Sequence, residues 1–282
     1  MSATRRKVEL VVISDVHLGT YGSHAKELKK LLKSIEPEIL VLNGDIIDIW
    51  QFSKRYWPKA HMKVIKEILN FSLNGTKIYY ITGNHDELLR KFADTKFGNL
   101  EIVNKLVLDL DGKKSWFFHG DVFDVTMQHA KWLAKLGAKG YDALILINRA
   151  ANYLLKLVGK ERISLSKRIK NGVKSAVNFI NNFEQLTTEL AAQNNFDYVI
   201  CGHIHQPDIK LFTTKHGQVT YLNSGDWVEN LSWLEYDKKT WSLKMFEDDW
   251  WDNDIEEDDD SDMDGKQIFN DLLIEFKLSN LN

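Results

Sequence analysis

The sequence predicts an α/β protein in which two sheets pack face to face between outer helices. Residues 1–81 alternate short apolar runs with helical patterns, an order typical of βαβ units and a parallel sheet. The apolar run at residues 40–42 ends in Asn43-Gly44-Asp45, which indicates a buried strand that delivers a carboxylate to the edge of that sheet. Short strand patterns at residues 198–246 supply a second sheet. We therefore expect an α/β/β/α four-layer sandwich that carries a helical insert.

The first elements have clear periodicities. A continuous Val- and Ile-rich run at residues 8–13 indicates a buried central strand, and leucines at 28, 31 and 32 follow the period of a helix. Strands are expected at residues 8–13, from Leu40 onward and at 77–81, and helices at 26–35 and 61–73.

The pattern changes after the third strand. Strands are expected at residues 103–110 and 115–118, then a long helical region at 127–193, then strands at 198–201, 209–213, 219–222, 231–236 and 241–246. The last four strands suggest a β-meander, and the turn at residues 223–226 is expected near the functional site. Residues 1–246 would form one domain with the insert at 127–193, and residues 247–282 an acidic, disordered tail.

Charge and composition narrow the possible environments. Residues 247–264 hold twelve acidic side chains, whereas residues 128–178 hold eleven Lys and Arg against two acidic residues. No apolar run reaches the roughly 18–20 residues that span a bilayer. The single cysteine, Cys201, cannot form an intrachain disulfide, which favours a reducing compartment.

Polar side chains of the kinds that bind metals follow five predicted strands. A lone histidine is more often a structural residue of the core, but here five of the nine histidines come directly after apolar runs. Carboxylates, imidazoles and an amide without thiolates favour manganese, iron, zinc or magnesium over a structural zinc site. The groups are Asp15 with His17, Asp45, Asn84 with His85, His119, and His203 with His205.

These motifs resemble those of the calcineurin-like metallophosphoesterase family, over roughly residues 7–246. They are Asp15-x-His17, Gly44-Asp45-x-x-Asp48, Gly83-Asn84-His85-Asp86, His119 and Gly202-His203-x-His205, in the order that the family has them. The resemblance implies a sandwich fold with two divalent metal ions, manganese first, with iron, zinc or magnesium as alternatives. One ion would take Asp15, His17 and His205, the other Asn84, His119 and His203, and Asp45 would bridge them.

The same resemblance implies a hydrolytic mechanism. Two cations about 3.5–4 Å apart lower the pKa of a shared water and clamp the phosphoryl oxygens. His85 would act as a catalytic group that stabilises the developing charge or protonates the leaving oxygen. Asp86 would be the catalytic carboxylate that orients His85. Asp48 either supports the site in the same way or is an ordinary turn carboxylate.

A narrower resemblance, to the UDP-2,3-diacylglucosamine hydrolase branch, concerns the substrate. Trp50 after Gly44-Asp45 and a helical insert after His119-Gly120-Asp121 match that branch. It implies a UDP-linked diacylated sugar lipid as substrate, UMP and a lipid monophosphate as products, and a cytoplasmic protein peripheral on the inner face of the cytoplasmic membrane. Substrate contacts would come from Asn84, His85, Trp50, Ser166, Lys167, Lys170, Asn171 and His203. One departure is His85, since the best-known members of the branch have Arg there.

Several alternatives stay open. The basic, aliphatic-rich insert suits an anionic amphiphile or a membrane surface, or it is a lid packed on the core. The enzyme could instead be a soluble phosphatase or phosphodiesterase for nucleotides or phosphoproteins. A binding module on an inactive scaffold would be expected to have lost metal ligands. No nucleic acid is expected as a partner, because the insert has aliphatic side chains where stacking aromatics would be needed.

Overall fold

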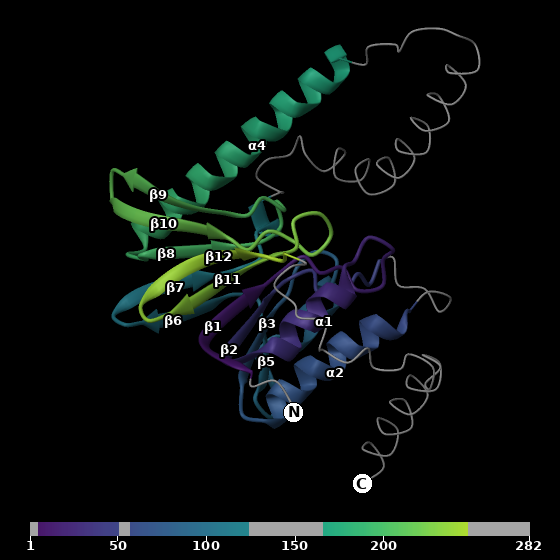
Figure 1. Ribbon diagram of the computed structural model, residues 1–282. Coiled ribbons are helices and arrows are strands. Elements are labelled where there is room, and N and C mark those ends of the chain that lie inside the picture. The colour runs from purple at the N-terminus through teal and green to yellow at the C-terminus, as the bar shows by residue number, and fades with distance from the viewer. Residues whose placement is uncertain (1–4, 51–56, 124–165, 248–282) are drawn as a thin grey trace, which may run out of the picture. The chain divides into compact units, whose positions relative to one another are not determined.

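A computed structural model of the chain describes residues 5–50, 57–123 and 166–247 (Figure 1). The first sheet contains β1 (Arg6–Ile13), β2 (Ile35–Asn43), β3 (Lys77–Ile81), β4 (Thr95–Phe97), β5 (Leu100–Val103), β11 (Ser232–Asp237) and β12 (Thr240–Met245). The second contains β6 (Leu106–Leu110), β7 (Lys113–Phe117), β8 (Tyr198–Cys201), β9 (Asp208–Thr214) and β10 (Gly217–Asn223). The helices are α1 (Ala25–Ser34), α2 (Lys59–Leu73) and α4 (Ser166–Gln193), with 3-10 turns η1 (Glu87–Phe92) and η2 (Asp121–Phe123).

Parallel strands form the middle of both sheets. The first sheet has the order β12-β11-β1-β2-β3-β5-β4, in which β1, β2, β3 and β5 run parallel. The second has the order β6-β7-β8-β10-β9, in which β7, β8 and β10 run parallel. Antiparallel strands occupy the edges. The carboxyl ends of neighbouring parallel strands therefore lie at one edge of each sheet.

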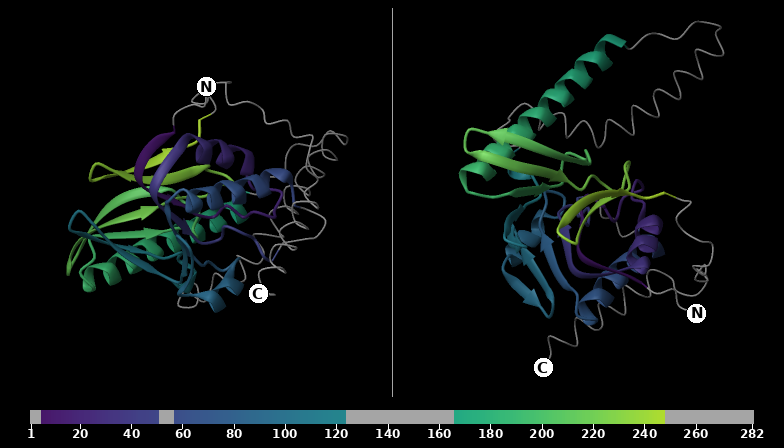
Figure 2. Two further views of the ribbon diagram at one scale, coloured as in Figure 1. Left: turned by 90° about the horizontal axis from the view of Figure 1, so that it is seen from below. Right: turned by 60° about the vertical axis from the view of Figure 1, so that its left-hand side comes forward.

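The two sheets pack face to face. Leu10 of β1 and Val41 of β2 lie in one buried cluster with Phe117 of β7, Ile200 of β8 and Leu222 of β10. The central strands are apolar without interruption because both of their faces are covered. This arrangement, visible in the two views of Figure 2, confirms the predicted α/β sandwich.

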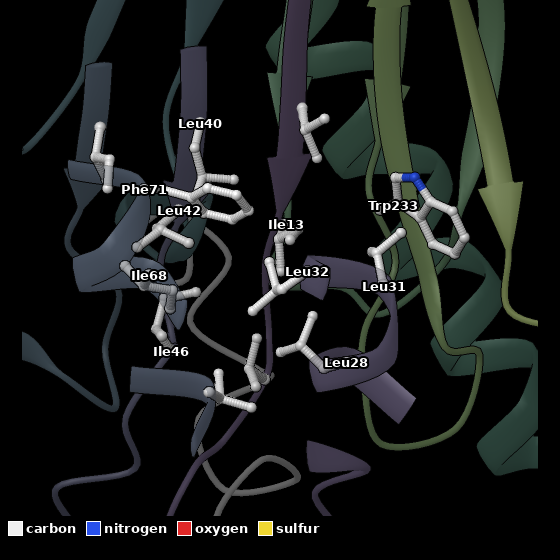
Figure 3. Packing of buried hydrophobic residues seen from close by; sticks show 14 of the residues in the cluster. Ile13, Leu28, Leu31, Leu32, Leu40, Leu42, Ile46, Ile68, Phe71 and Trp233 are labelled. Carbon is white, nitrogen blue, oxygen red and sulfur yellow. The ribbon is translucent and has the colours of Figure 1, made fainter. Parts of the chain in front are cut away.

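Helices α1 and α2 cover the outer face of the first sheet. Leu28, Leu31 and Leu32 lie on one face of α1 because residues three and four apart are neighbours on a helix. They pack beside Ile13 of β1, as Figure 3 shows. The corresponding residues of α2 are Ile68 and Phe71, next to Leu40 and Leu42 of β2 (Figure 3). The leucine spacing in the sequence thus predicts α1 to within one residue at each end.

The described residues divide into two units. One joins the chain up to Gly120 to the chain from Thr188, and the other runs from Asp121 to Thr187. Of the predicted insert, residues 127–165 lie outside the described residues, and 166–193 form α4. The predicted tail lies outside them too, except for Glu247. None of the described helices is long and apolar enough to cross a membrane.

Two predictions about the strands are wrong. The expected strand at 103–110 is two strands, because Val103 ends β5 in the first sheet and Leu106 begins β6 in the second. The polar residues Asn104 and Lys105 carry the chain from one sheet to the other. The expected meander is not formed either. Its strands make two separate hairpins, β9-β10 in the second sheet and β11-β12 in the first. Periodicity identifies strands, but it does not tell to which of two stacked sheets a strand belongs.

Candidate metal centre

The predicted ligands all follow strands whose carboxyl ends meet. The strands β1, β2 and β3 are parallel neighbours in the first sheet, and β7 and β8 are parallel neighbours in the second. Because the sheets are stacked, these two edges lie together. Asp15 and His17 follow β1, Asp45 follows β2, Asn84 follows β3, His119 follows β7, and His203 and His205 follow β8.

Backbone hydrogen bonds join these strand ends. The N–H of His17 donates to the carbonyl of Asp45 at 2.9 Å, and that of Gly202 donates to the carbonyl of His119 at 2.9 Å. Between the sheets, the N–H of His203 donates to Asp15 Oδ2 at 3.0 Å. The ligand-bearing loops are therefore joined by main-chain hydrogen bonds within each sheet, and by a bond to the Asp15 carboxylate between the sheets.

The predicted ligands gather into two clusters. Asp15, His17 and His205 form one, in which His205 Nε2 lies 3.2 Å from Asp15 Oδ1. Asp45, His119 and His203 form the other, in which His119 Nε2 lies 3.2 Å from Asp45 Oδ2. Within each cluster, the potential ligand atoms all lie within 4.8 Å of one another.

Asn84 lies beside the second cluster. The N–H of the next residue, His85, donates to Asp45 Oδ1 at 2.8 Å. The Asn84 Oδ1 atom is buried, and no described group donates a hydrogen bond to it. Buried polar atoms normally have a partner, so an isolated acceptor at this position fits a cation. His17 Nε2 in the first cluster is likewise buried without a described hydrogen-bond partner.

Three of the imidazoles have an oxygen next to Nδ1. His119 Nδ1 donates to the carbonyl of Asn43 at 2.9 Å, since a carbonyl can only accept. His17 Nδ1 lies 3.5 Å from Asp48 Oδ2, and His205 Nδ1 lies 3.5 Å from Asp226 Oδ2. An oxygen acceptor at Nδ1 favours the tautomer that leaves the Nε2 lone pair for a metal.

The backbone of the site is unusual. Five of the seven predicted ligands have a left-handed conformation, with φ values of 51° at Asp15, 50° at His17, 54° at Asp45, 69° at His203 and 52° at His205. Asp and His tolerate this region better than most residues, but each such residue costs about 1 kcal/mol or more. Such outliers cluster where the surrounding structure holds side chains in place for a function.

Two glycines let the strand ends approach each other. A Cβ atom at Gly44 would collide with the ring of His119, and a Cβ at Gly83 would collide with Asp45 Oδ1. Gly44 also has a φ of 84°. No other residue could bring β2 and β3 this close to the imidazole that follows β7.

The ionisable groups of the clusters support each other's charges. Burial raises the pKa of Asp15, but the charge of His205 and its hydrogen bond outweigh burial and lower that pKa to about 2. Burial lowers the pKa of His205, and Asp15 more than offsets this, raising it to about 9. The pKa of Asp45 is also lowered, chiefly by His119 acting against burial. These carboxylates are therefore anionic at neutral pH, as cation binding requires.

His85 lies at the edge of the first cluster and contacts Asp48. The His85 Nδ1 atom is 2.8 Å from Asp48 Oδ2. Burial lowers the pKa of His85, but the hydrogen bond to Asp48 and the charge of Asp45 outweigh burial and raise it. The Trp50 ring lies 4.6 Å from the His85 ring between centroids and is 58% exposed. His85 is thus a half-buried, protonatable group under an exposed aromatic ring.

Asp86 has a different role from the one that the sequence suggested. Its carboxylate accepts hydrogen bonds from Tyr80 Oη at 2.6 Å and from the N–H groups of Gly83 at 2.6 Å and Ile46 at 3.0 Å. The side chain that contacts the His85 ring is Asp48. The prediction that Asp86 orients His85 is therefore corrected: Asp86 joins the loop after β2 to β3 and to the loop after β3.

The other predicted substrate contacts fall into two groups. Asn84, His85, Trp50 and His203 lie at the clusters. Ser166, Lys167, Lys170 and Asn171 lie in the first turns of α4, and their side chains lie outside the described structure. Sequence reasoning missed the supporting roles of Asn43 and Asp226, and the only signal was the turn expected at 223–226.

The donor set fits divalent cations. Carboxylate, imidazole and amide donors without thiolate are ligands for manganese, iron, zinc or magnesium. The isolated acceptor Asn84 Oδ1 and the lone pair of His17 Nε2 both lie at the clusters. Asp15, His17 and His205 could hold one ion, and Asn84, His119 and His203 another, with Asp45 between them.

Known proteins with similar sequences include several that are named UDP-2,3-diacylglucosamine hydrolase. The UDP-2,3-diacylglucosamine hydrolase of Aliivibrio fischeri (strain MJ11) is 27% identical over 213 residues, which cover 75% of this chain and 86% of that protein. The protein of that name from Blochmanniella pennsylvanica (strain BPEN) is 26% identical over 246 residues, 82% of this chain and 93% of its own. A solved structure of a dimetal phosphatase from Danio rerio aligns with a TM-score of 0.39 at 13% identity, over 84% of this chain and 95% of that one, too low to support a conclusion.

A match to a family model shows the family of this chain. Residues 8–207 match the family model described as calcineurin-like phosphoesterase, which is well over half of the chain. The match begins in β1 and ends just after His205, so that it contains every predicted ligand. The chain belongs to the calcineurin-like phosphoesterase family and is a hydrolase of that family.

Proposed function

We propose that this hydrolase cleaves the pyrophosphate of UDP-2,3-diacylglucosamine, giving UMP and a lipid monophosphate, with two divalent ions in its site. The observation that carries the reaction class is the convergence of two three-residue clusters of metal ligands at one edge of the stacked sheets. The substrate is supported by the relatives of that name, which match 75–82% of this chain.

The ligands divide between two ions. Asp15, His17 and His205 would hold one, and Asn84, His119 and His203 would hold the other, with Asp45 placed to serve both. Manganese suits this mixture of oxygen and imidazole donors. When bound, the ions activate a water and neutralise charge on the phosphoryl oxygens. The chain itself fixes the ligand geometry through the left-handed backbone of the strand ends.

His85 supplies the proton chemistry. The raised pKa of His85 favours the protonated form of its ring, and Asp48 stabilises that form at Nδ1. The Nε2 proton then stabilises negative charge on the substrate or passes to the leaving oxygen. The exposed Trp50 ring over His85 provides an apolar surface for substrate at the mouth of the site.

The lipid part of the substrate requires a second set of contacts. Ser166, Lys167, Lys170 and Asn171 at the start of α4 supply polar groups and positive charge. The basic segment 128–178 suits an anionic amphiphile at a membrane surface. The enzyme would therefore work as a peripheral protein on the inner face of the cytoplasmic membrane.

A second candidate is a phosphatase or phosphodiesterase acting on nucleotides or phosphoproteins. The observation that favours it is His85, which gives the motif Gly83-Asn84-His85-Asp86 in place of the Arg form of the lipid enzymes. Both candidates use the same metal centre and the same His85-Asp48 pair, so only the substrate separates them.

The test is a comparison of two substrates with manganese present. We would measure kcat/KM for UMP release from UDP-2,3-diacylglucosamine in mixed micelles, and for hydrolysis of bis-p-nitrophenyl phosphate. The proposal predicts that kcat/KM is much higher for the lipid substrate. Hydrolysis of the generic ester without UMP release would contradict the substrate and leave the second candidate.

A further inference from the structure

The loop between β10 and β11 lies outside the residues that match the family model. It contacts the cluster formed by Asp15, His17 and His205. Ser14 Oγ lies 2.7 Å from Ser224 Oγ and donates to the carbonyl of Gly225 at 3.1 Å. The N–H of Trp227 donates to the carbonyl of Asp15 at 3.0 Å. The loop is thus attached to the strand end that carries Asp15.

Among the described residues of this loop, Asp226 is the one charged residue that is fully buried. A buried carboxylate is costly unless hydrogen bonds compensate its lost hydration. Its Oδ1 atom accepts from three backbone N–H groups, those of Val228 at 2.8 Å, Glu229 at 2.5 Å and Asn230 at 3.1 Å. These three bonds fix the orientation of the carboxylate. They all end on Oδ1, so Oδ2 is left to contact other groups.

The Oδ2 atom faces His205. It accepts from Asn230 Nδ2 at 2.6 Å and lies 3.5 Å from His205 Nδ1. Asn230 Nδ2 also donates to the carbonyl of His205 at 2.9 Å. Asp226 and Asn230 together therefore hold both the ring and the backbone of His205, a residue whose φ is 52°.

We propose that Asp226, held by Asn230, is a positioning residue that prepares His205 to bind metal. An oxygen beside Nδ1 favours a ring proton there, so that Nε2, which lies 3.2 Å from Asp15 Oδ1, can give up its own proton and offer its lone pair to a cation. In the other cluster, the carbonyl of Asn43 takes the corresponding place at Nδ1 of His119, at the shorter distance of 2.9 Å. This inference rests on the proposed metal binding, but it does not depend on the substrate.

A merely structural role for Asp226 makes a different prediction. If the carboxylate only capped the backbone turn, its replacement would lower stability and leave the metal affinity of the folded protein unchanged. Asp226→Asn separates the two roles. It keeps an oxygen for the three N–H groups but replaces Oδ2 by an amide that cannot accept the His205 proton.

The experiment measures metal affinity on the folded full-length protein. Manganese dissociation constants would be obtained by chelator competition, and the ions bound per chain by elemental analysis. We expect Asp226→Asn to lower the affinity for one of the two ions by about 10–100-fold and to leave the affinity for the other unchanged. Asn230→Ser should lower the affinity for the same ion by a smaller factor. The matched control is Ser232→Ala, which removes a hydrogen bond to the Ser224 carbonyl at 2.8 Å in the same loop and should change neither affinity.

The outcomes are distinct. Unchanged affinity for both ions in folded Asp226→Asn would overturn the inference, and so would an equal weakening of both ions. If Asp226→Asn does not fold, Asn230→Ser decides by the same criterion. A wild-type protein that binds two ions but does not cleave the lipid substrate would defeat the proposed substrate and leave this inference standing.

Discussion

Asp48 and His85 form a hydrogen-bonded pair, with Oδ2 of the carboxylate 2.8 Å from Nδ1 of the ring. The same Oδ2 atom lies 3.5 Å from Nδ1 of His17. One buried carboxylate thus contacts both the proposed proton donor and a proposed metal ligand. It raises the pKa of the first and faces Nδ1 of the second.

Replacing Asp48 by Asn should impair turnover more than metal binding. The amide oxygen can still accept from one imidazole, but it no longer stabilises a protonated His85. We expect kcat to fall by about 10–100-fold with both ions retained. Steady-state kinetics with elemental analysis of the same sample checks this. Wild-type kcat would mean that Asp48 is only a turn residue.

His85→Ala should remove the proton donor without removing a ligand. General acid catalysis contributes about 10²–10⁴-fold, so kcat should fall by that range. The ions should stay bound, because neither cluster of predicted ligands contains His85. An elemental analysis that finds fewer ions in the variant would show instead that His85 is a ligand.

Gly83→Ala should distort the second cluster. Its Cβ would lie 2.7 Å from the Asp45 nitrogen and 2.8 Å from His119 Cδ2, closer than real Cβ contacts. Such overpacking costs about 1–3 kcal/mol. We expect a lower unfolding temperature and weaker metal binding in the same variant. Gly22→Ala is the control, because its Cβ would meet only Val228 Cγ1, at 3.2 Å, and it should bind metal normally.

The stability of the protein should depend on the pH through His61. Burial lowers the pKa of this residue from 6.5 to about 4, and its Nδ1 accepts the N–H of Gly19 at 2.9 Å. Below about pH 6.5 the unfolded chain binds a proton that the folded protein does not bind. The free energy of unfolding should therefore be highest above that pH and fall by up to about 3 kcal/mol as the pH drops toward 4.

Urea unfolding at about pH 7.5 and about pH 5 measures this effect. His61→Asn is the matched variant, because its amide oxygen can accept the Gly19 N–H but does not titrate. The variant should lose less stability than the wild type between the two pH values. Equal losses would show that His61 does not titrate in this range on unfolding.

The sequence predicts the strand ends well because their signal is local. An apolar run that leads into Gly-Asp, Gly-Asn or Gly-His marks the end of a buried strand, and the structure confirms the strands at 77–81 and 198–201 residue for residue. The predicted ligands Asp45, His119 and His203 then meet because parallel strands of both sheets end at a common edge.

The rest depends on contacts between distant segments. Asp48 and Asp86 both lie in motifs next to a ligand, and only the folded backbone shows that Asp48 contacts His85 while Asp86 contacts Tyr80. Asp226 is about twenty residues past His205 and acts through a turn. In the same way, no local pattern shows that the chain changes sheets between Val103 and Leu106.

Asp45→Ala shows whether the strand-end residues form a metal centre that performs hydrolysis. Metal content and turnover of the generic ester would be measured together, with the exposed Asp109→Ala as control, since Asp109 only accepts the Gly112 N–H at 2.7 Å. Asp45→Ala should lose at least one ion and its activity, while the control keeps its metal content and its activity. An Asp45→Ala protein with full metal content and wild-type turnover would contradict the proposed metal centre.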